Sequence, residues 1–365
     1  MLSIQDVKYD CLYFRGTVPC KPNKLYNEVC STCRFYQPIE KRILIIKLGA
    51  LGDVIRTTPL VASFRKMYPY CHITWVTLSP EILPKTQINE IYKLDAVSLF
   101  LLPQLSFDIA INLDKEPEAC ALLAQVKATQ KFGFSWNGKH IVPANQNAEH
   151  KLMTGFFDNI SKTNTKSYLQ EIFEICGLEF QYEEYLLDVE EHFEQKWKTI
   201  LREKANGKKI IGLNTGCGAR WLTRLWPEEY WIELIQKLQQ SGYFPVVLGG
   251  KDEEPKNLMY VQRTGVYYPG TYSIPEFIAI NQNCDGIVSA VSMAMHIAVG
   301  LKKPLILFNN IFNKHEFELY GRGEIVEPSV GCDCFYGNTC KREEHCMKYL
   351  SVQTVYEAIL RHIPL

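Results

Sequence analysis

The chain has 365 residues, 47% of them hydrophobic, and its 40 Lys and Arg residues balance 40 Asp and Glu residues. This length favours two domains with sizeable cores, and the hydrophobic content excludes wholesale disorder. A net charge of zero argues against nucleic-acid binding, and a charged substrate would have to be bound by a few charged side chains at its site. No apolar run approaches the roughly 18 residues needed to cross a bilayer and no signal-like apolar core begins the chain, so we expect a cytoplasmic protein without a transmembrane segment.

The first 40 residues are polar and show no regular hydrophobic period, so we expect a Cys-rich N-terminal module at 1–40 rather than a core. The last two of its four cysteines form a Cys-x-x-Cys pair. In a reducing compartment such thiols indicate metal ligation rather than disulfides. The candidate ligands are Cys11, Cys20, Cys30 and Cys33.

From residue 41 onward, apolar runs alternate with helical stretches. Strands are predicted at 42–48, 72–77 and 107–112, and a helix at 54–67 that includes Pro59. Alternation of this kind predicts parallel βαβ units, and we assign the first domain to residues 41–204.

The pattern restarts after a polar stretch near residue 204, and we assign the second domain to residues 205–327. Strands are predicted at 209–213, 244–248, 286–289 and 304–308, and helices at 228–241, 274–282 and 293–301. The fold class is therefore α/β, with two doubly wound, Rossmann-like domains facing a cleft that holds the ligand. A Cys-rich segment and a helix at 352–362 complete the chain over residues 328–365.

The first candidate loop lies between strand 42–48 and the following helix. Gly49 and Gly52 allow a tight turn, and Asp53 falls near a helix N-terminus, where a general base could accept a proton from a hydroxyl. The alternative is that Asp53 only caps the helix. Asp114, at the end of strand 107–112, is the reserve base, with capping as its default role.

The second candidate loop follows strand 209–213. Thr215 and Gly216 provide small groups suited to a diphosphate, and Arg220 or Arg224 could neutralise a departing phosphate. The alternative is that a helix simply begins here and that both arginines are solvated.

Two further strand ends complete the predicted donor side. Gly249 and Gly250 would let a nucleotide approach the backbone, and Ser292 and Met293 begin a helix whose free amides could bind phosphate. His296 lies one turn further on, where it is either a satisfied core residue or a member of the site.

Taken in order, these segments resemble the bacterial heptosyltransferases, glycosyltransferase family nine, which have the GT-B fold. The resemblance rests on KRILIIKLGALGDVIRTTPL at 41–60, RLWP at 224–227, LGG at 248–250 and MHIA at 295–298. It implies that the first half binds an acceptor and the second half a nucleotide sugar, typically ADP-heptose. It also implies one inverting displacement without a metal at the reacting carbon. Asp53 matches the family's base, and Arg224 matches the basic residue, usually Lys, that holds the donor phosphates.

One departure from the family pattern concerns the helix at 293–301. Family members commonly carry Asp-Thr/Ser-Gly before this helix, whereas this chain has Val291, Ser292 and Met293. The missing carboxylate and the bulky Met mark a divergent branch. The segment 308–317 and the cysteines after it resemble the autotransporter heptosyltransferases, which glycosylate protein and carry a cysteine-bound iron.

Four cysteines gather within 15 residues near the C-terminus, on a turn-rich segment that suits a structural tetrathiolate site for zinc or iron. They are Cys332, Cys334, Cys340 and Cys346. The two cysteine clusters could form separate sites or combine in one. The remaining five cysteines are expected to be small buried side chains.

The sequence therefore predicts an inverting glycosyltransferase that moves a sugar, heptose by resemblance, from a nucleotide donor to a hydroxyl on a glycan or protein. The alternative is a non-catalytic sugar-nucleotide-binding or assembly protein on the same fold. A nicotinamide-dependent oxidoreductase is excluded, because no Gly-x-Gly-x-x-Gly follows the first strand. The partners expected are a nucleotide sugar, the acceptor and a possible homo-oligomer, with no nucleic acid.

Overall fold

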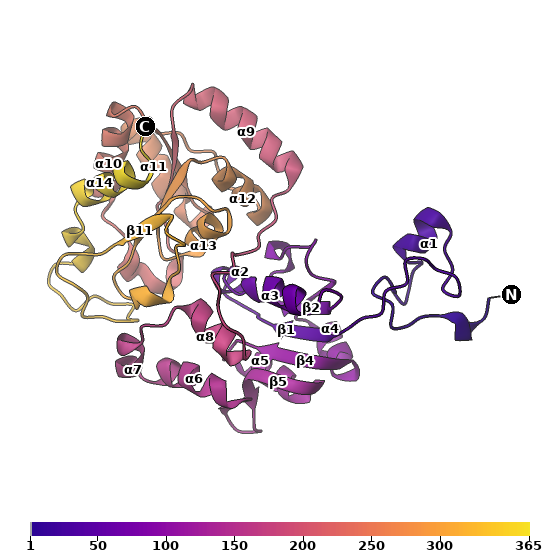
Figure 1. Cartoon of the computed structure of the whole chain (residues 1–365). Helices are drawn as coiled ribbons and strands as arrows, with labels where there is room; N and C mark the ends of the chain where they lie inside the picture. The colour runs from indigo at the N-terminus through magenta and orange to yellow at the C-terminus, as the bar shows by residue number, and fades with distance from the viewer. Residues whose placement is uncertain (1) are drawn as a thin grey trace.

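The computed structural model describes residues 2–365, except for the side chains of residues 219 and 220. Two lobes, each built on a mainly parallel sheet with helices packed against it, lie together, and a small N-terminal module stands apart from them (Figure 1). The predicted α/β architecture with two Rossmann-like domains is confirmed.

The first lobe is built on a sheet with the strand order β3-β2-β1-β4-β5-β6. Its strands are β1 (Arg42–Ile46), β2 (His72–Thr77), β3 (Glu90–Lys93), β4 (Ser106–Asn112), β5 (Lys127–Trp136) and β6 (Ile141–Pro143). Only the pairing of β5 with β6 is antiparallel among the described strands of this sheet. β1 pairs with β2 and β4, and burial on both faces explains its continuous apolar run.

The helices of the first lobe correct one prediction. They are α2 (Leu51–Ile55), α3 (Pro59–Met67), α4 (Ala96–Leu101), α5 (Pro117–Gln125), α6 (Glu149–Phe156), α7 (Asp158–Thr163) and α8 (Tyr168–Ile175). The single helix predicted at 54–67 is wrong, because α2 ends and a new helix begins at Pro59. Proline suits this first position, since its fixed φ fits a helix and the N–H that it lacks would have no partner there.

The second lobe is built on a parallel sheet with the strand order β11-β10-β9-β7-β8. The strands are β7 (Ile210–Asn214), β8 (Phe244–Leu248), β9 (Gly286–Ala290), β10 (Leu305–Phe308) and β11 (Gly323–Val326). The helices are α9 (Glu191–Ala205), α10 (Glu228–Gln240), α11 (Glu254–Thr264), α12 (Ile274–Gln282), α13 (Met293–Gly300) and α14 (Val352–His362). Every strand and helix predicted between 209 and 308 is present.

Helix α9 joins the second lobe through packing. It lies against α12, and the indole N–H of Trp197 donates to Glu276 at 3.0 Å. The boundary predicted at 204 would assign α9 to the first domain, and the domain boundaries stay a prediction.

The two lobes meet where α2 packs on α13. Gly52 of α2 lies directly against the His296 ring, because a Cβ built on this glycine would come within 2.3 Å of the ring's Cδ2 atom. The absence of a side chain at Gly52 therefore brings the loop that carries Asp53 against the second lobe.

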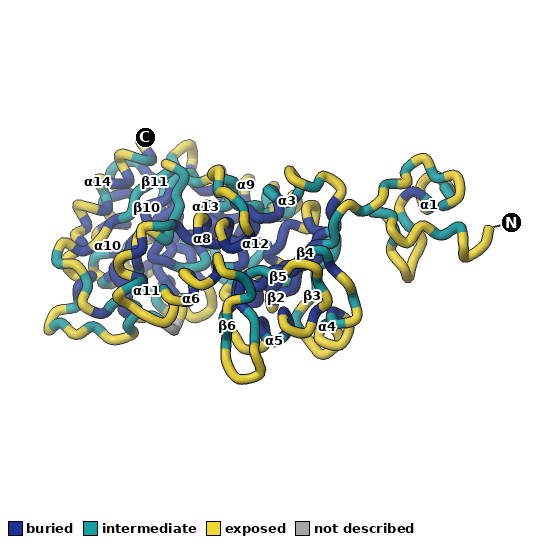
Figure 2. Tube along the Cα trace, turned by 60° about the horizontal axis from the view of Figure 1, so that its bottom comes forward, coloured by how far each residue is buried: buried dark blue, intermediate teal, exposed yellow. Residues whose placement is uncertain are grey.

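The two cysteine-rich ends of the chain lie at opposite sides of the molecule (Figures 1 and 2). The N-terminal module, with α1 (Lys21–Tyr26), extends beyond the first lobe. The C-terminal helix α14 packs on α10, β10 and β11 and so remains with the second lobe. A single metal site shared by both clusters is therefore ruled out. No helix in the described part of the chain is both long and apolar enough to cross a membrane.

Candidate active site

The loop after β1 is held by charged contacts with the end of β4. Lys47 pairs with Asp114, and the Leu48 backbone N–H donates to the same carboxylate. Burial raises the pKa of Asp114, while the Lys47 charge opposes that shift. Asp114, the reserve base, is thus buried, and its carboxylate is already bound to Lys47 and the Leu48 amide. The geometry therefore favours Asp53 for proton transfer.

Asp53 lies in the first turn of α2, whose N-cap residue is Ala50. The capping alternative is therefore wrong, since the Asp53 carboxylate points to a side chain. Its Oδ1 atom lies 2.8 Å from Nη2 of Arg56, and its side chain is 35% exposed. Oδ2 makes no hydrogen bond or ion pair within the described residues, which leaves one oxygen open to a substrate hydroxyl.

Charge around Asp53 keeps it ionised. Burial would raise its pKa, but the positive charges of Arg56 and Lys47 outweigh burial and lower the pKa below its usual range. At neutral pH Asp53 is therefore a carboxylate, which is the form that can accept a proton.

Arg56 connects Asp53 with the second lobe. Its guanidinium lies 3.6 Å from the centre of the Tyr168 ring and 3.9 Å from Oε2 of Glu316. The hydroxyl of Tyr336 donates to the same glutamate. These contacts join residues about 260 and 280 positions apart in the chain, so no local pattern could have identified them. The pairing of Arg56 with Asp53 is different, because three residues separate the two and that spacing was a usable signal.

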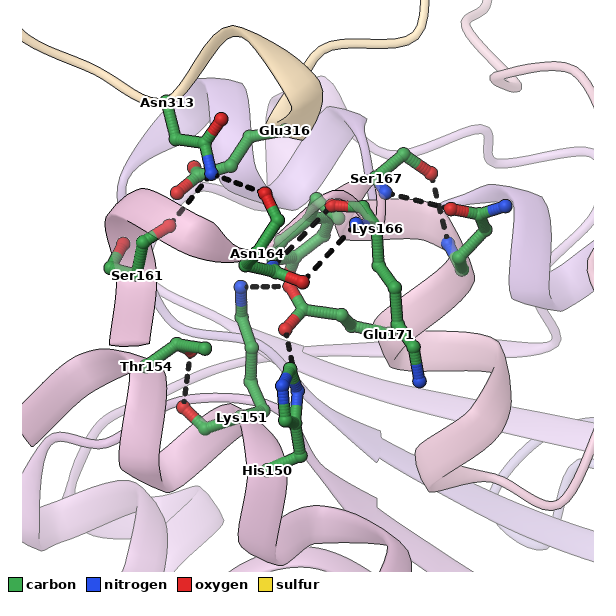
Figure 3. Close-up of polar contacts among 12 residues, drawn as sticks. His150, Lys151, Thr154, Ser161, Asn164, Lys166, Ser167, Glu171, Asn313 and Glu316 are labelled. Carbon is green, nitrogen blue, oxygen red and sulfur yellow. Dashed lines mark hydrogen bonds and ion pairs between the residues drawn. The ribbon is translucent and has the colours of Figure 1, made fainter. Parts of the chain in front are cut away.

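A polar cluster on α6, α7 and α8 lies beside these residues (Figure 3). Glu171, which is buried, pairs with Lys151 and contacts His150 at 3.4 Å. The side-chain amide of Asn313 donates to the backbone carbonyls of Ser161 and Asn164 at 2.7 and 2.6 Å, which ties the second lobe to the first.

Lys115 adds an unpaired cation near this cluster. Its ammonium has no hydrogen bond or ion pair within residues 2–365 as described, and it lies against Gly155 of α6. Burial, followed by the charge of Lys151, lowers the pKa of Lys115 to about 8. An anionic group entering here would find an available positive charge.

On the donor side, Asn214 at the end of β7 fixes the neighbouring loops. Its amide donates to the Gly216 carbonyl at 2.9 Å, to Ser289 at 3.1 Å and to Ser292 at 3.3 Å. Thr215 bonds Asn257 of α11 at 2.7 Å, so this residue too is occupied within the protein. Asn214 was not among the predicted site residues, although its place at a strand end was a usable signal.

Arg224 is buried, which excludes the solvated alternative. Its guanidinium donates to three backbone carbonyls, those of Trp221, Val291 and Cys217. It also lies 5.4 Å from the centre of the Phe312 ring, which in turn packs 5.1 Å from Tyr336. The structure thus connects Arg224 with the Asp53 side of the site. The side chain of Arg220 lies outside the described residues.

The predicted glycines of the donor side lie under Glu253. A Cβ on Gly216 would come within 2.1 Å of the Glu253 carboxylate, and one on Gly249 would come within 2.8 Å of Asn257. The Gly250 amide donates to Glu253 at 2.9 Å. Gly216 and Gly249 therefore make room for protein side chains in this structure.

At the start of α13, Ser292 is the N-cap residue but its hydroxyl makes no capping hydrogen bond. Met293 follows it, and the Val291 side chain is buried. His296 is buried against Gly52, and its Nδ1 has no hydrogen-bond partner in the described structure. Burial lowers the pKa of His296 to about 3, so the ring is neutral and serves the contact between lobes.

The C-terminal thiols converge. The Sγ atoms of Cys332 and Cys334 are 3.3 Å apart, and Cys346 contacts both Cys332 and Cys340. Thiolates bound to one zinc ion would stand about 3.8 Å apart, given bonds of about 2.3 Å in a tetrahedron. No three His, Cys, Asp or Glu side chains of the described residues are arranged to hold a metal ion. The donor set suits zinc or iron, whereas the observed arrangement is that of packed thiols.

The five scattered cysteines are buried, as predicted. They are Cys71, Cys120, Cys176, Cys217 and Cys284. Each of them therefore packs as a small side chain.

The chain is similar to known glycosyltransferases in sequence. A family model described as glycosyltransferase family 9 (heptosyltransferase) matches residues 101–322, more than half of the chain. Lipopolysaccharide heptosyltransferase 3 of Escherichia coli (strain K12) is 23% identical over 290 residues, which cover 70% of this chain and 78% of that protein.

Solved structures show the same fold. A glycosyl transferase family 9 protein from Veillonella parvula has a TM-score of 0.67 at 19% identity, covering 88% of this chain and 97% of that one. The dodecameric, iron-containing heptosyltransferase TibC with ADP-D-β-D-heptose has a TM-score of 0.53 at 12% identity, covering 88% and 75%. The predicted GT-B architecture is thereby confirmed.

Proposed function

The chain belongs to glycosyltransferase family 9, and from that premise we propose that it transfers a heptose from ADP-heptose to an acceptor hydroxyl. The observation that carries the proposal is Asp53, an ionised carboxylate that Arg56 fixes through one oxygen while the other faces no protein partner in the described residues. A carboxylate held in this way can accept a proton in a fixed direction.

The proposed reaction is one inverting displacement. The acceptor oxygen attacks the anomeric carbon, the bond from that carbon to the diphosphate oxygen breaks, and Asp53 takes the hydroxyl proton. ADP leaves with the electron pair of the broken bond. By family resemblance, no metal acts at the reacting carbon.

Arg224 is the proposed stabiliser of the departing diphosphate. A guanidinium has five N–H groups. Three contacts go to backbone carbonyls, so further N–H groups remain for phosphate oxygens. The start of α13 adds free backbone amides and the positive end of a helix dipole.

The acceptor is proposed to be an anionic glycan such as a lipopolysaccharide core. The ammonium of Lys115, which has no hydrogen bond or ion pair in the described residues, provides positive charge on the first lobe, whereas its neighbour Lys151 is paired with Glu171. A protein acceptor, as suggested by the resemblance to autotransporter heptosyltransferases, is the second candidate. A cytoplasmic location and a homo-oligomer complete the proposal.

The C-terminal thiols are proposed to hold a structural zinc or iron ion. Cys332, Cys334, Cys340 and Cys346 would be its ligands, and the ion would link the turn at 330–346 to the second lobe. TibC, to which the fold is similar, is described as iron-containing. Elemental analysis of the purified protein tests this proposal.

The test of function measures heptose transfer from ADP-heptose to lipopolysaccharide core acceptors, with products identified by mass spectrometry. Asp53→Asn should lower turnover by about 10²- to 10⁴-fold, the usual contribution of a general base, while leaving donor affinity nearly unchanged. Asp158→Asn is the matched control, because Asp158 is exposed and its side chain makes no hydrogen bond or ion pair in the described residues. Equal turnover in the two variants would refute the assignment of Asp53.

The non-catalytic alternative makes the opposite prediction for the unmodified chain. It expects ADP-heptose to bind without transfer or hydrolysis under any acceptor condition. Family membership and the preserved Asp53 and Arg224 favour the enzyme.

A further inference from the structure

The N-terminal module is folded without a core. Among residues 2–40, only Pro22 is buried. Figure 2 shows the module mostly in the colours of intermediate and exposed residues. Segments of this size rarely fold on hydrophobic burial alone and usually depend on disulfides or metals. Something other than apolar packing must therefore hold the module in one conformation.

Backbone hydrogen bonds nevertheless join the beginning of the module to its end. Residues near Cys11 pair with residues near Pro38, through Leu12 N–H to Gln37 O and Ile39 N–H to Asp10 O, both at 2.8 Å. Cys20 precedes α1, and Cys30 and Cys33 lie in the turn beyond it. This closure brings four cysteines from distant positions toward one another.

All four thiols line a single cavity of about 280 Å³. Each cysteine is half-buried, and none has a disulfide or a side-chain hydrogen bond within residues 2–40. The carboxylates at the same cavity are already engaged, since Asp6 accepts from the Ser3 amide and Glu28 pairs with Arg34 at 2.9 Å. The thiols are thus the free ligands of the cavity, whereas the C-terminal thiols contact one another.

We propose that Cys11, Cys20, Cys30 and Cys33 form a tetrathiolate metal centre that holds the N-terminal module together. Thiolates select zinc or an iron–sulfur cluster over hard cations such as Mg²⁺. Lys8 and Arg15 line the same cavity and oppose the net negative charge that four thiolates leave around a divalent ion. No three of these thiols are arranged to hold a metal ion in the described structure, so binding would draw them closer together within the cavity that they line.

The test measures metal per chain in the full-length protein, together with acid-labile sulfide. Cys30→Ser with Cys33→Ser should lose one zinc ion, or one iron–sulfur cluster, relative to the unmodified chain. Cys334→Ser with Cys346→Ser is the matched control, which removes thiols only from the C-terminal cluster. It should lose the ion proposed for that cluster and keep the N-terminal metal, so the two pairs of substitutions combined should lose both metals. Sulfide together with iron identifies a cluster, and zinc without sulfide identifies a single ion.

A second measurement does not depend on the variants folding. In the unmodified chain, chelation should abolish hydrogen-exchange protection of the Leu12 and Ile39 amides while protection in β1 and β4 persists. The four cysteines should also become open to alkylation together. Unchanged metal content in the N-terminal variant, or two disulfides among these cysteines, would overturn the proposal. Neither readout involves sugar transfer, so the result is independent of the proposed function.

Discussion

In the first lobe, the candidate base Asp53 is held by another charged side chain, Arg56, whereas in the second lobe Arg224 is held by backbone carbonyls. The first arrangement keeps Asp53 ionised, because the positive charge of Arg56 lowers the pKa of Asp53. The second arrangement sets a position, because carbonyls from two loops fix a guanidinium without neutralising it. The surroundings of Asp53 are therefore suited to proton transfer, and those of Arg224 to holding a positive charge in one place.

The largest expected effect concerns the donor side. Arg224→Met should destabilise the protein by about 3 kcal/mol, because it leaves buried carbonyls without donors. Chemical denaturation measures the change. Arg263→Met is the control, since Arg263 pairs with Glu229 on the exposed surface, where water and salt screen the interaction, and its loss should change the free energy of unfolding far less. Equal losses would mean that Arg224 does not hold its loops together.

The next effect concerns the contact between the lobes. Gly52→Ala places a methyl group against the His296 ring and should cost about 2 kcal/mol through overpacking. Gly49→Ala is the matched control, because the nearest atom to its added Cβ would be 4.0 Å away. Thermal unfolding of both variants measures the difference in stability. A Gly52→Ala variant as stable as the unmodified chain would show that the lobes can readily separate there.

The smallest effect concerns the charge beside the base. Arg56 lowers the pKa of Asp53, so Arg56→Met should raise the pKa of Asp53. Activity that requires the carboxylate is lost as pH falls through this pKa, and the acid limb of the pH–rate profile should therefore move to higher pH. Lys66→Met, which alters an exposed cation of α3, should leave the limb in place. An unmoved limb in Arg56→Met would show that Arg56 does not control Asp53.

Much of the fold could be predicted because strands buried on both faces have continuous apolar runs. β1, β9 and β10 are of this kind. β3 and β11 were missed because they are short, half-buried edge strands, and β5 because its polar positions interrupt the run.

The candidate site was only partly predictable. Asp53 could be found because strand, glycines and helix follow one another in the chain. Its partner Arg56 lies three residues further on, a spacing that also could have been recognised. The contacts of Arg56 with Tyr168 and Glu316 could not, because these residues approach only in the folded molecule. The capping alternative failed for a related reason, since the sequence could not show that α2 begins at Leu51.

The contact between Gly52 and His296 has a mechanical consequence, because Gly52 is the residue immediately before Asp53. A residue close to the axis of a rotation moves less than residues far from it. If the lobes rotate about this contact to admit a nucleotide sugar, Asp53 keeps its distance to α13 while remote surfaces travel far. Asp53 would then stay directed at the second lobe while the lobes move.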